Sequence, residues 1–220
     1  MKKTYLKEFV KYTQNKIAYI PVGTIEWHGN HLPIETDFLV AKKICEIVAK
    51  NNSGYILPPI YMGSDRKEKI GGKQLVGMDR YVGKKLQGSV YYLEPNFFSE
   101  LIINLSNNLI SQGFEKIILV TGHAGTGQIK ALEMAKKKIK NLSVCNPYET
   151  LEKNGIHVEH ADENETSLFW ACYPEEEIKI RKIKLKRDDD YVKFLGYNPI
   201  SKASLALGKR MLNEIIKKIK

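Results

Sequence analysis

Cysteine is scarce in this chain of 220 residues. Its three cysteines lie far apart, and no two of them form a CxxC pair. An odd number of isolated cysteines argues against a disulfide framework and against a zinc site made of thiolates. The three residues are Cys45, Cys145 and Cys172.

Long hydrophobic runs are also absent. No apolar stretch approaches the roughly 18 residues that a membrane span needs, so we expect no membrane partner. Residues 1–9 contain three lysines and lack the apolar core of a signal peptide. We therefore expect a cytoplasmic protein.

Arginine is rare as well. The net charge is +10, but the positive residues are 30 lysines and only 5 arginines. Arginine is the side chain best suited to bidentate phosphate and base contacts, and the lysines are scattered along the chain. We interpret the charge as a solvated surface and expect no nucleic-acid partner. A nucleotide- or nucleic-acid-binding α/β module is the alternative that the charge supports.

Short apolar runs alternate with segments of helical spacing. With 43% hydrophobic and 27% charged residues, the composition is globular, and the length fits one domain over residues 1–220. The alternation predicts an α/β fold around a mainly parallel sheet. Two stretches stay unassigned: residues 63–88 are rich in glycine and charge and long for a loop, and residues 175–199 fit neither period well. The predicted strands are 16–23, 55–60, 116–120 and 142–145, and the predicted helices are 36–50, 99–112, 127–140, 163–172 and 201–220.

Polar residues gather directly after the first predicted strand. Glu26 and His28 are two residues apart, so in extended backbone they point to the same side. Asp37 falls at the start of the next predicted helix. These side chains can meet at the carboxyl end of the sheet, where open α/β sheets bind ligands. The alternative is a polar loop followed by a helix cap.

Two further clusters have similar chemistry. His123 follows the clearest predicted strand on a glycine-rich turn, T-G-H-A-G-T-G at 121–127. This turn is not a P-loop, because no Gly-Lys-Ser/Thr follows it. The third cluster, residues 157–167, holds two histidines and several carboxylates, and we favour His160 over His157 as functional. Mixed imidazole and carboxylate ligands suit Zn²⁺, Mn²⁺ or Fe²⁺.

Three segments in this order resemble the creatininase (creatinine amidohydrolase) superfamily. They are P-V-G with E-W-H-G-N-H-L-P and Asp37 in 21–37, T-G-H-A-G at 121–125, and H-A-D with E-T-S in 160–167. The resemblance implies a three-layer α/β/α sandwich, hydrolysis of a small amide-like bond, one or two metal ions and frequently a hexamer. It also implies that Asp37 bridges the metals, that Glu165 is a further site carboxylate and ligand, and that His160 carries a proton. The implied metal ligands are Glu26, His28, Asp37, His123 and Glu165.

Two positions depart from the members that hydrolyse creatinine. Those members have a glutamate two residues after the ligand histidine, where this chain has Gly125, so a second metal here depends on Glu165. They also close the pocket with tryptophans, whereas this chain has only Trp27 and Trp170. We therefore do not expect creatinine as the substrate. Members similar in carrying glycine include a deformylase acting on a formylamino-pyrimidine nucleotide, and a further branch opens a cyclic polyhydroxy ketone.

We therefore predict a metal-dependent hydrolase that cleaves a C–N bond of a small amide, cyclic amide or formamide. Metal-activated water attacks the carbonyl carbon, and His160, oriented by Glu159 or Glu165, passes a proton to the leaving group. We expect one or two Zn, Mn or Fe ions per chain and a homo-oligomer. The alternatives are a cyclic-ketone C–C hydrolase and a catalytically inactive metal-binding homologue. The residues expected to contact the substrate are Trp27, His31 and Gly125.

Overall fold

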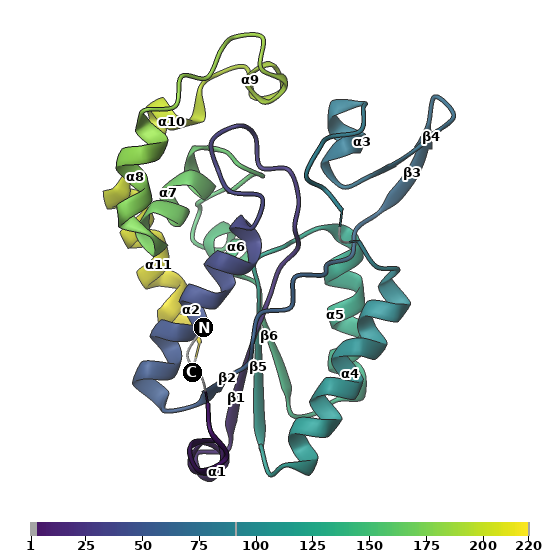
Figure 1. Ribbon diagram of the computed structural model, residues 1–220, viewed down its shortest axis with the longest axis vertical. Coiled ribbons are helices and arrows are strands. Elements are labelled where there is room, and N and C mark those ends of the chain that lie inside the picture. The colour runs from purple at the N-terminus through teal and green to yellow at the C-terminus, as the bar shows by residue number, and fades with distance from the viewer. Residues whose placement is uncertain (1–3, 91, 220) are drawn as a thin grey trace.

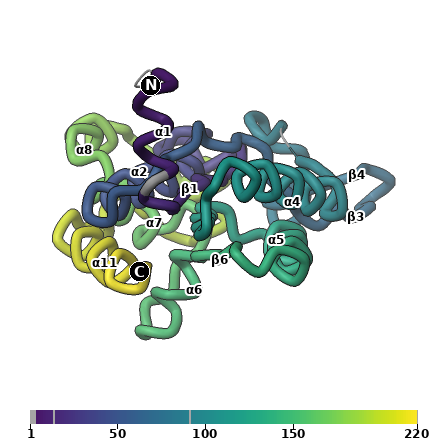
Figure 2. Tube along the Cα trace, turned by 90° about the horizontal axis from the view of Figure 1, so that it is seen from below, coloured from purple at the N-terminus to yellow at the C-terminus, as the bar shows by residue number. Residues whose placement is uncertain are grey.

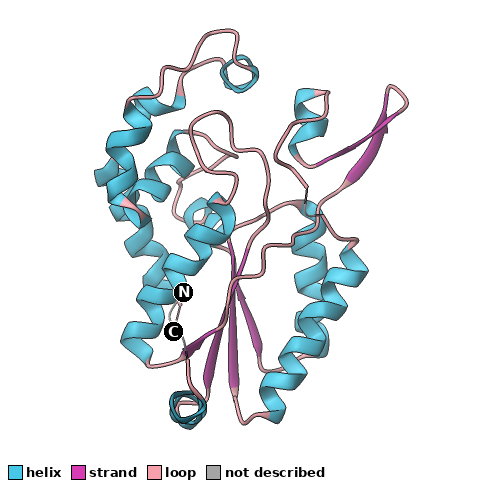
Figure 3. Cartoon of the chain, viewed as in Figure 1, coloured by secondary structure: helices cyan, strands magenta, loops and turns pink. Residues whose placement is uncertain are grey.

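Four parallel strands form the centre of the molecule. In this computed structural model, which describes residues 4–90 and 92–219, the strand order is β2-β1-β5-β6. Figure 3 draws the strands in magenta. Strands β1 and β5 pair along their whole lengths, from Ile17 opposite Lys116 to Val22 opposite Thr121. Helices cover both faces of this pair, and its strands are mostly apolar, as in other parallel sheets. The strands are β1 (Ile17–Val22), β2 (Tyr55–Ile56), β5 (Lys116–Thr121) and β6 (Leu142–Cys145).

Helices cover the sheet on both sides (Figures 1 and 2). Helices α2 (Thr36–Asn52), α7 (Glu163–Cys172) and α11 (Leu205–Lys218) lie on one face, and α4 (Pro95–Ser111) and α5 (Thr126–Lys138) lie on the other. Each face has its own apolar core. This arrangement confirms the predicted three-layer α/β/α fold. Among the described residues, no helix combines the length and apolar character needed to cross a membrane.

Several element boundaries differ from the prediction for local reasons. Strand β2 ends at Ile56 rather than at residue 60, because Pro58 and Pro59 have no N–H to donate to a ladder. Helix α4 begins four residues early, at Pro95, a residue favoured in the first helical position. The predicted helix 201–220 is divided into α10 (Pro199–Lys202) and α11, and the Ser204 side chain caps the second.

Both unassigned stretches contain regular structure. Residues 63–88 hold an antiparallel hairpin and a short helix, and residues 175–199 hold most of one helix and all of another. Two short helices, at the start of the chain and after β6, were not predicted. These elements are β3 (Lys67–Ile70), β4 (Lys73–Val76), α3 (Met78–Val82), α8 (Pro174–Arg181), α9 (Asp190–Leu195), α1 (Leu6–Gln14) and α6 (Pro147–Glu152).

Candidate metal centre

Asp37 lies between the carboxyl ends of β1 and β5 because two glycines leave room for it. A Cβ on Gly122 would lie 1.9 Å from the Asp37 carbonyl oxygen, and one on Gly23 would lie 2.2 Å from the Phe38 nitrogen. No side chain fits in either space, so the first turn of α2 packs directly against both strand ends. The carboxylate of Asp37 is thereby buried between the loops that follow the two strands.

One oxygen of Asp37 faces the loop after β5. Asp37 Oδ2 lies 3.2 Å from His123 Nδ1, and Glu26 Oε1 lies 3.1 Å from the same nitrogen. All three side chains are buried. Their ligand atoms are close enough to share one ion. We call Glu26, Asp37 and His123 the first ligand group.

The other oxygen of Asp37 faces His28. Asp37 Oδ1 lies 3.0 Å from His28 Nε2, and Glu165 Oε2 lies 3.9 Å from that nitrogen. His28 donates its Nδ1–H to the Glu26 carbonyl oxygen at 3.0 Å, which leaves Nε2 facing the carboxylates. We call His28, Asp37 and Glu165 the second ligand group; its ligand atoms also lie close enough to share an ion.

Two partly buried tyrosines hold the outer oxygens of the glutamates. Tyr92 donates its hydroxyl hydrogen to Glu26 Oε2, and Tyr148 donates to Glu165 Oε1 at 2.7 Å. Burial and then the nearby carboxylates raise the pKa of both tyrosines, so the hydroxyls remain donors. The sequence analysis missed both residues. In sequence they look like ordinary core aromatics, and only the fold brings them to the centre.

His160 stands beside both groups. Its Nε2–H donates to the Trp27 carbonyl oxygen at 2.5 Å, and its Nδ1 lies 3.4 Å from Glu26 Oε1. Its ring packs against His28 at a tilt of 37°, with centroids 4.2 Å apart. Neither Glu159 nor Glu165 makes the expected orienting contact to His160, because Glu159 pairs with His157 instead. The Trp27 carbonyl and Glu26 orient His160.

The buried centre attracts positive charge. Burial disfavours every charged form here, so shifts in the other direction require close opposite charges. Against burial, Asp37 and the two glutamates raise the pKa of His28 to about 10. Also against burial, Glu26 and Asp37 raise the pKa of His123, and the surrounding histidines lower the pKa of Glu26 well below its ordinary value.

The donor set fits a divalent metal. Asp37 Oδ2 is buried and accepts no hydrogen bond from the described residues. Its nearest positive partner is the ring of His123, with 3.2 Å between Oδ2 and Nδ1, and a buried carboxylate oxygen without a hydrogen bond is costly unless a cation satisfies it. Imidazole nitrogens and carboxylate oxygens are suitable ligands for Zn²⁺, Mn²⁺ or Fe²⁺. The two groups share Asp37 and present one histidine and one glutamate each.

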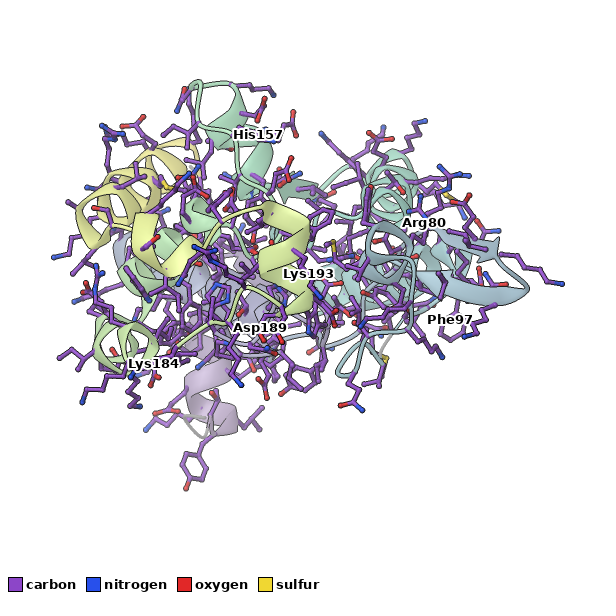
Figure 4. All side chains as sticks on the ribbon, turned by 90° about the horizontal axis from the view of Figure 1, so that it is seen from above. Arg80, Phe97, His157, Lys184, Asp189 and Lys193 are labelled. Atoms are coloured by element: carbon purple, nitrogen blue, oxygen red, sulfur yellow. The ribbon has the colours of Figure 1, made fainter. Side chains whose placement is uncertain are left out.

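A cavity of about 220 Å³ opens beside the centre. Met78 and Tyr81 of α3 line it, and α3 and α9 lie on opposite sides at the top of Figure 1. Side chains connect these two parts of the chain: Tyr81 and Phe194 are in ring contact, and Lys84 pairs with Asp190 at 2.6 Å. Figure 4, viewed from above, shows Asp189 and Lys193 near the middle of the view and Arg80 to one side. Residues that line the cavity and bear on its chemistry are Glu26, Asp37, His123, Gly125, His160 and Glu165.

The other candidate residues lie behind or beside the cavity. His28 is fully buried and does not line it. The ring of Trp27 packs edge-on against Tyr191, with centroids 5.1 Å apart, and its carbonyl serves His160. His31 Nε2 lies 3.0 Å from Thr166 Oγ1. Burial lowers the pKa of His31 to about 4, so this imidazole is neutral.

Comparison with known proteins gives consistent matches. The family model described as creatininase, creatinine amidohydrolase, matches residues 2–219. Creatinine amidohydrolase of Pseudomonas putida is 22% identical over 181 residues, which span 72% of this chain and 65%, just under two thirds, of that protein.

Solved structures match over almost the whole chain. A crystal structure of creatinine amidohydrolase superposes with a TM-score of 0.71 at 18% identity, covering 98% of this chain and 92% of the other. A creatininase described as the Mn form has a TM-score of 0.70 at 18% identity, covering 98% and 93%. Other creatininase structures in this set are described as a Zn–Zn type and as a complex with creatine.

Proposed function

The chain belongs to the creatininase family, and on that premise we propose that it is a metal-dependent hydrolase that cleaves a C–N bond of a small molecule. The observation that carries the proposal is the shared aspartate. One oxygen of Asp37 faces His123 with Glu26, and the other faces His28 with Glu165. Glu165 supplies the carboxylate ligand that glycine at position 125 cannot provide. The two ligand groups would hold one metal ion each.

Metal ions held there would lower the pKa of bound water and polarise a carbonyl oxygen of the substrate. The protein supplies the proton transfer. Because His160 donates Nε2–H to the Trp27 carbonyl, its Nδ1 is free to take a proton beside Glu26 and give it to a leaving nitrogen. The contact with His28 holds the ring in that orientation.

The cavity favours substrates other than creatinine. Gly125 contributes no side chain, and a Cβ there would lie 2.5 Å from His123 Nε2. Neither tryptophan lines the cavity: Trp170 is fully buried, and Trp27 packs against α9. Formamides and cyclic amides remain the substrate classes that fit a compact, polar site with a proton donor beside it.

Turnover by metal-loaded protein tests the proposal. The protein is reconstituted separately with Zn²⁺, Mn²⁺ and Fe²⁺ and assayed on panels of formamides, cyclic amides and cyclic ketones. We expect hydrolysis of an amide or formamide, with His160→Gln reducing kcat about 100-fold or more, as for other general acid–base residues. His157→Gln is the matched control, because that histidine is two-thirds exposed at the surface, and it should change kcat less than twofold.

Three results would overturn the proposal. Turnover of cyclic ketones alone would identify a C–C hydrolase of the same family. Metal-loaded protein with no turnover on any panel would identify an inactive metal-binding homologue. Equal activity of His160→Gln and wild type would remove His160 from the mechanism.

A further inference from the structure

The two ring nitrogens of His123 have different surroundings. Nδ1 lies between the carboxylates of Glu26 and Asp37, whereas Nε2 is buried without a hydrogen-bond partner among the described residues. A buried ring N–H left unpaired costs roughly 1–3 kcal/mol. Within the described ranges, Asp65 is the one acidic residue within 4.0 Å of this nitrogen, and its Oδ2 lies 3.9 Å away.

The loop that carries Asp65 is fixed to the same helix that follows His123. The backbone N–H of Ser64 donates to Gln128 Oε1 of α5 at 2.9 Å, and Gln128 Nε2 donates to Thr121 Oγ1 of β5 at 3.3 Å. This chain of contacts ties the loop to the strand end where His123 begins its turn. The position of Asp65 relative to His123 is therefore set by buried hydrogen bonds.

Three glycines leave the space that Asp65 occupies. A Cβ on Gly125 would lie 2.6 Å from Asp65 Cγ, and a Cβ on Gly127 would lie 2.7 Å from Asp65 Cα. A Cβ on Gly77 would lie 3.2 Å from Asp65 Oδ2. Asp65 therefore occupies the space that a side chain at position 125 would take.

The carboxylate of Asp65 is oriented as well as placed. Its Oδ1 accepts the backbone N–H of Arg66 at 2.6 Å, which leaves Oδ2 toward His123. The side chain is only 10% exposed and lines the cavity. Metal-binding histidines usually donate their second ring N–H to a carboxylate, a carbonyl or water, which fixes the tautomer and the ring orientation.

We propose that Asp65 is the positioning residue of His123. Its carboxylate accepts the Nε2–H and holds the ring with Nδ1 toward Glu26 and Asp37. The separation of 3.9 Å closes to hydrogen-bond length with a shift of about 1 Å, and such contacts commonly tighten when a site is loaded. The inference rests on the proposed metal centre, and it concerns an acidic residue of the cavity that neither ligand group contains.

The test compares Asp65→Ala and Asp65→Asn with the wild type and with Asp188→Ala, an exposed control. The first measurement is the ¹⁵N spectrum of the His123 ring in metal-free protein, assigned by its loss in His123→Gln. The second is the affinity for Zn²⁺ alone, measured by competition with a chelator. Circular dichroism and thermal unfolding show whether each variant is folded.

We expect Asp65→Ala to shift the His123 Nε2 resonance and to weaken Zn²⁺ binding about 10- to 100-fold, the usual cost of losing such a partner. Asp65→Asn keeps the size and the contact to the Arg66 N–H but loses the charge. Its resonance shift and its Zn²⁺ affinity should therefore lie between those of the wild type and Asp65→Ala. Asp188→Ala should match the wild type in both measurements.

One outcome would overturn this proposal, and a different one would overturn the proposed function. If Asp65 only shapes its own loop, Asp65→Asn will bind Zn²⁺ like the wild type, and neither variant will shift the His123 resonance. If wild type binds no Zn²⁺, the proposed function fails. The ring spectrum of metal-free protein still tests the contact between Asp65 and His123, so the two failures are distinguishable. Should Asp65→Ala not fold, Asp65→Asn decides the question alone.

Discussion

The two ligand groups are built alike but lie differently with respect to the cavity. Each pairs one histidine with one glutamate, each glutamate is held by a tyrosine, and both share Asp37. His123 of the first group lines the cavity, whereas His28 of the second group is fully buried behind it. His160 adjoins the first group through Glu26 and packs against the second group through His28.

This difference suggests a division of work between the groups. The first group, open to the cavity, is placed to meet the substrate, and its histidine has the outer partner Asp65 proposed above. Only His28 of the second group lies away from the cavity, and Glu165 also accepts the backbone N–H of Ala161 at 2.5 Å. We expect the second group to hold its ion more firmly, because its protein ligands are better fixed. Variants that act on one group at a time test this comparison.

Removing one glutamate ligand should have the largest effect. Glu26→Gln and Glu165→Gln should each lower bound zinc from two equivalents to one and reduce kcat about 100-fold or more, because each ion contributes several kcal/mol to the transition state. Glu26→Gln should be the more severe, since Glu26 also faces His160. Elemental analysis and steady-state kinetics measure both, with exposed Glu152→Gln as control. If Glu165→Gln still binds two equivalents of zinc, the second ligand group does not hold an ion through Glu165.

Alanine in place of either of two tightly packed glycines should weaken zinc binding by the two ligand groups to different extents. The effect should be smaller than that of losing a glutamate ligand. A Cβ on Gly122 would press on the Asp37 carbonyl at 1.9 Å, and a Cβ on Gly208 would press on the Ser167 carbonyl of α7 at 1.8 Å. Both alanine variants should lose about 1–3 kcal/mol of unfolding free energy. Gly122→Ala should weaken both zinc sites, whereas Gly208→Ala should weaken only the Glu165 site. Urea unfolding and zinc titration check this, and equal weakening of both sites in the two variants would contradict it.

Loss of a tyrosine hydroxyl should cost about tenfold in zinc affinity, the lower end for outer partners of metal ligands. Tyr92→Phe removes the donor to Glu26, and Tyr148→Phe removes the donor to Glu165. Tyr92→Phe should weaken zinc binding by the first ligand group, and Tyr148→Phe should weaken zinc binding by the second ligand group. Tyr61→Phe, at an exposed ring, is the control. A change below twofold in both variants would show that the hydroxyls do not orient the glutamates.

The smallest expected effect is the contribution of the surface residue His157 to the pH dependence of stability. His157 belongs to neither ligand group and therefore serves as a reference. Hydrogen bonds to Glu152 and then Glu159 raise the pKa of His157 above its ordinary value. A raised folded pKa contributes stability below the unfolded pKa of about 6.5, and this contribution is lost as pH rises through the folded value. Because the side chain is two-thirds exposed, the contribution is small. An NMR titration should show the raised pKa falling in Glu152→Gln, and an unchanged value would contradict the assignment.

Much of the fold and part of the site follow from local pattern. The apolar runs at β1 and β5 and the helical spacing of α2 were readable, because burial imposes a period on each segment. The five predicted ligands come together because all follow strand ends or begin helices at one edge of the sheet. Their role as ligands stays a prediction.

The remaining site residues depend on contacts that no local pattern encodes. Tyr92 and Tyr148 reach the glutamates only after distant segments pack, and a tyrosine in sequence is indistinguishable from a core aromatic. Asp65 lies in the stretch 63–88, whose hairpin and short α3 carry little periodicity. The position of Asp65 beside His123 becomes apparent only in the folded chain, where Gly125 and Gly127 leave room for it.

The most direct test of the shared centre is the zinc content per chain of wild type and Asp37→Ala, purified without chelator and reconstituted with Zn²⁺ alone. Asp188→Ala, which removes an exposed carboxylate, is the matched control. Because Asp37 belongs to both ligand groups, we predict two equivalents in wild type and control and loss of both in Asp37→Ala. Wild type that binds no zinc, or Asp37→Ala that keeps both ions, would contradict the account.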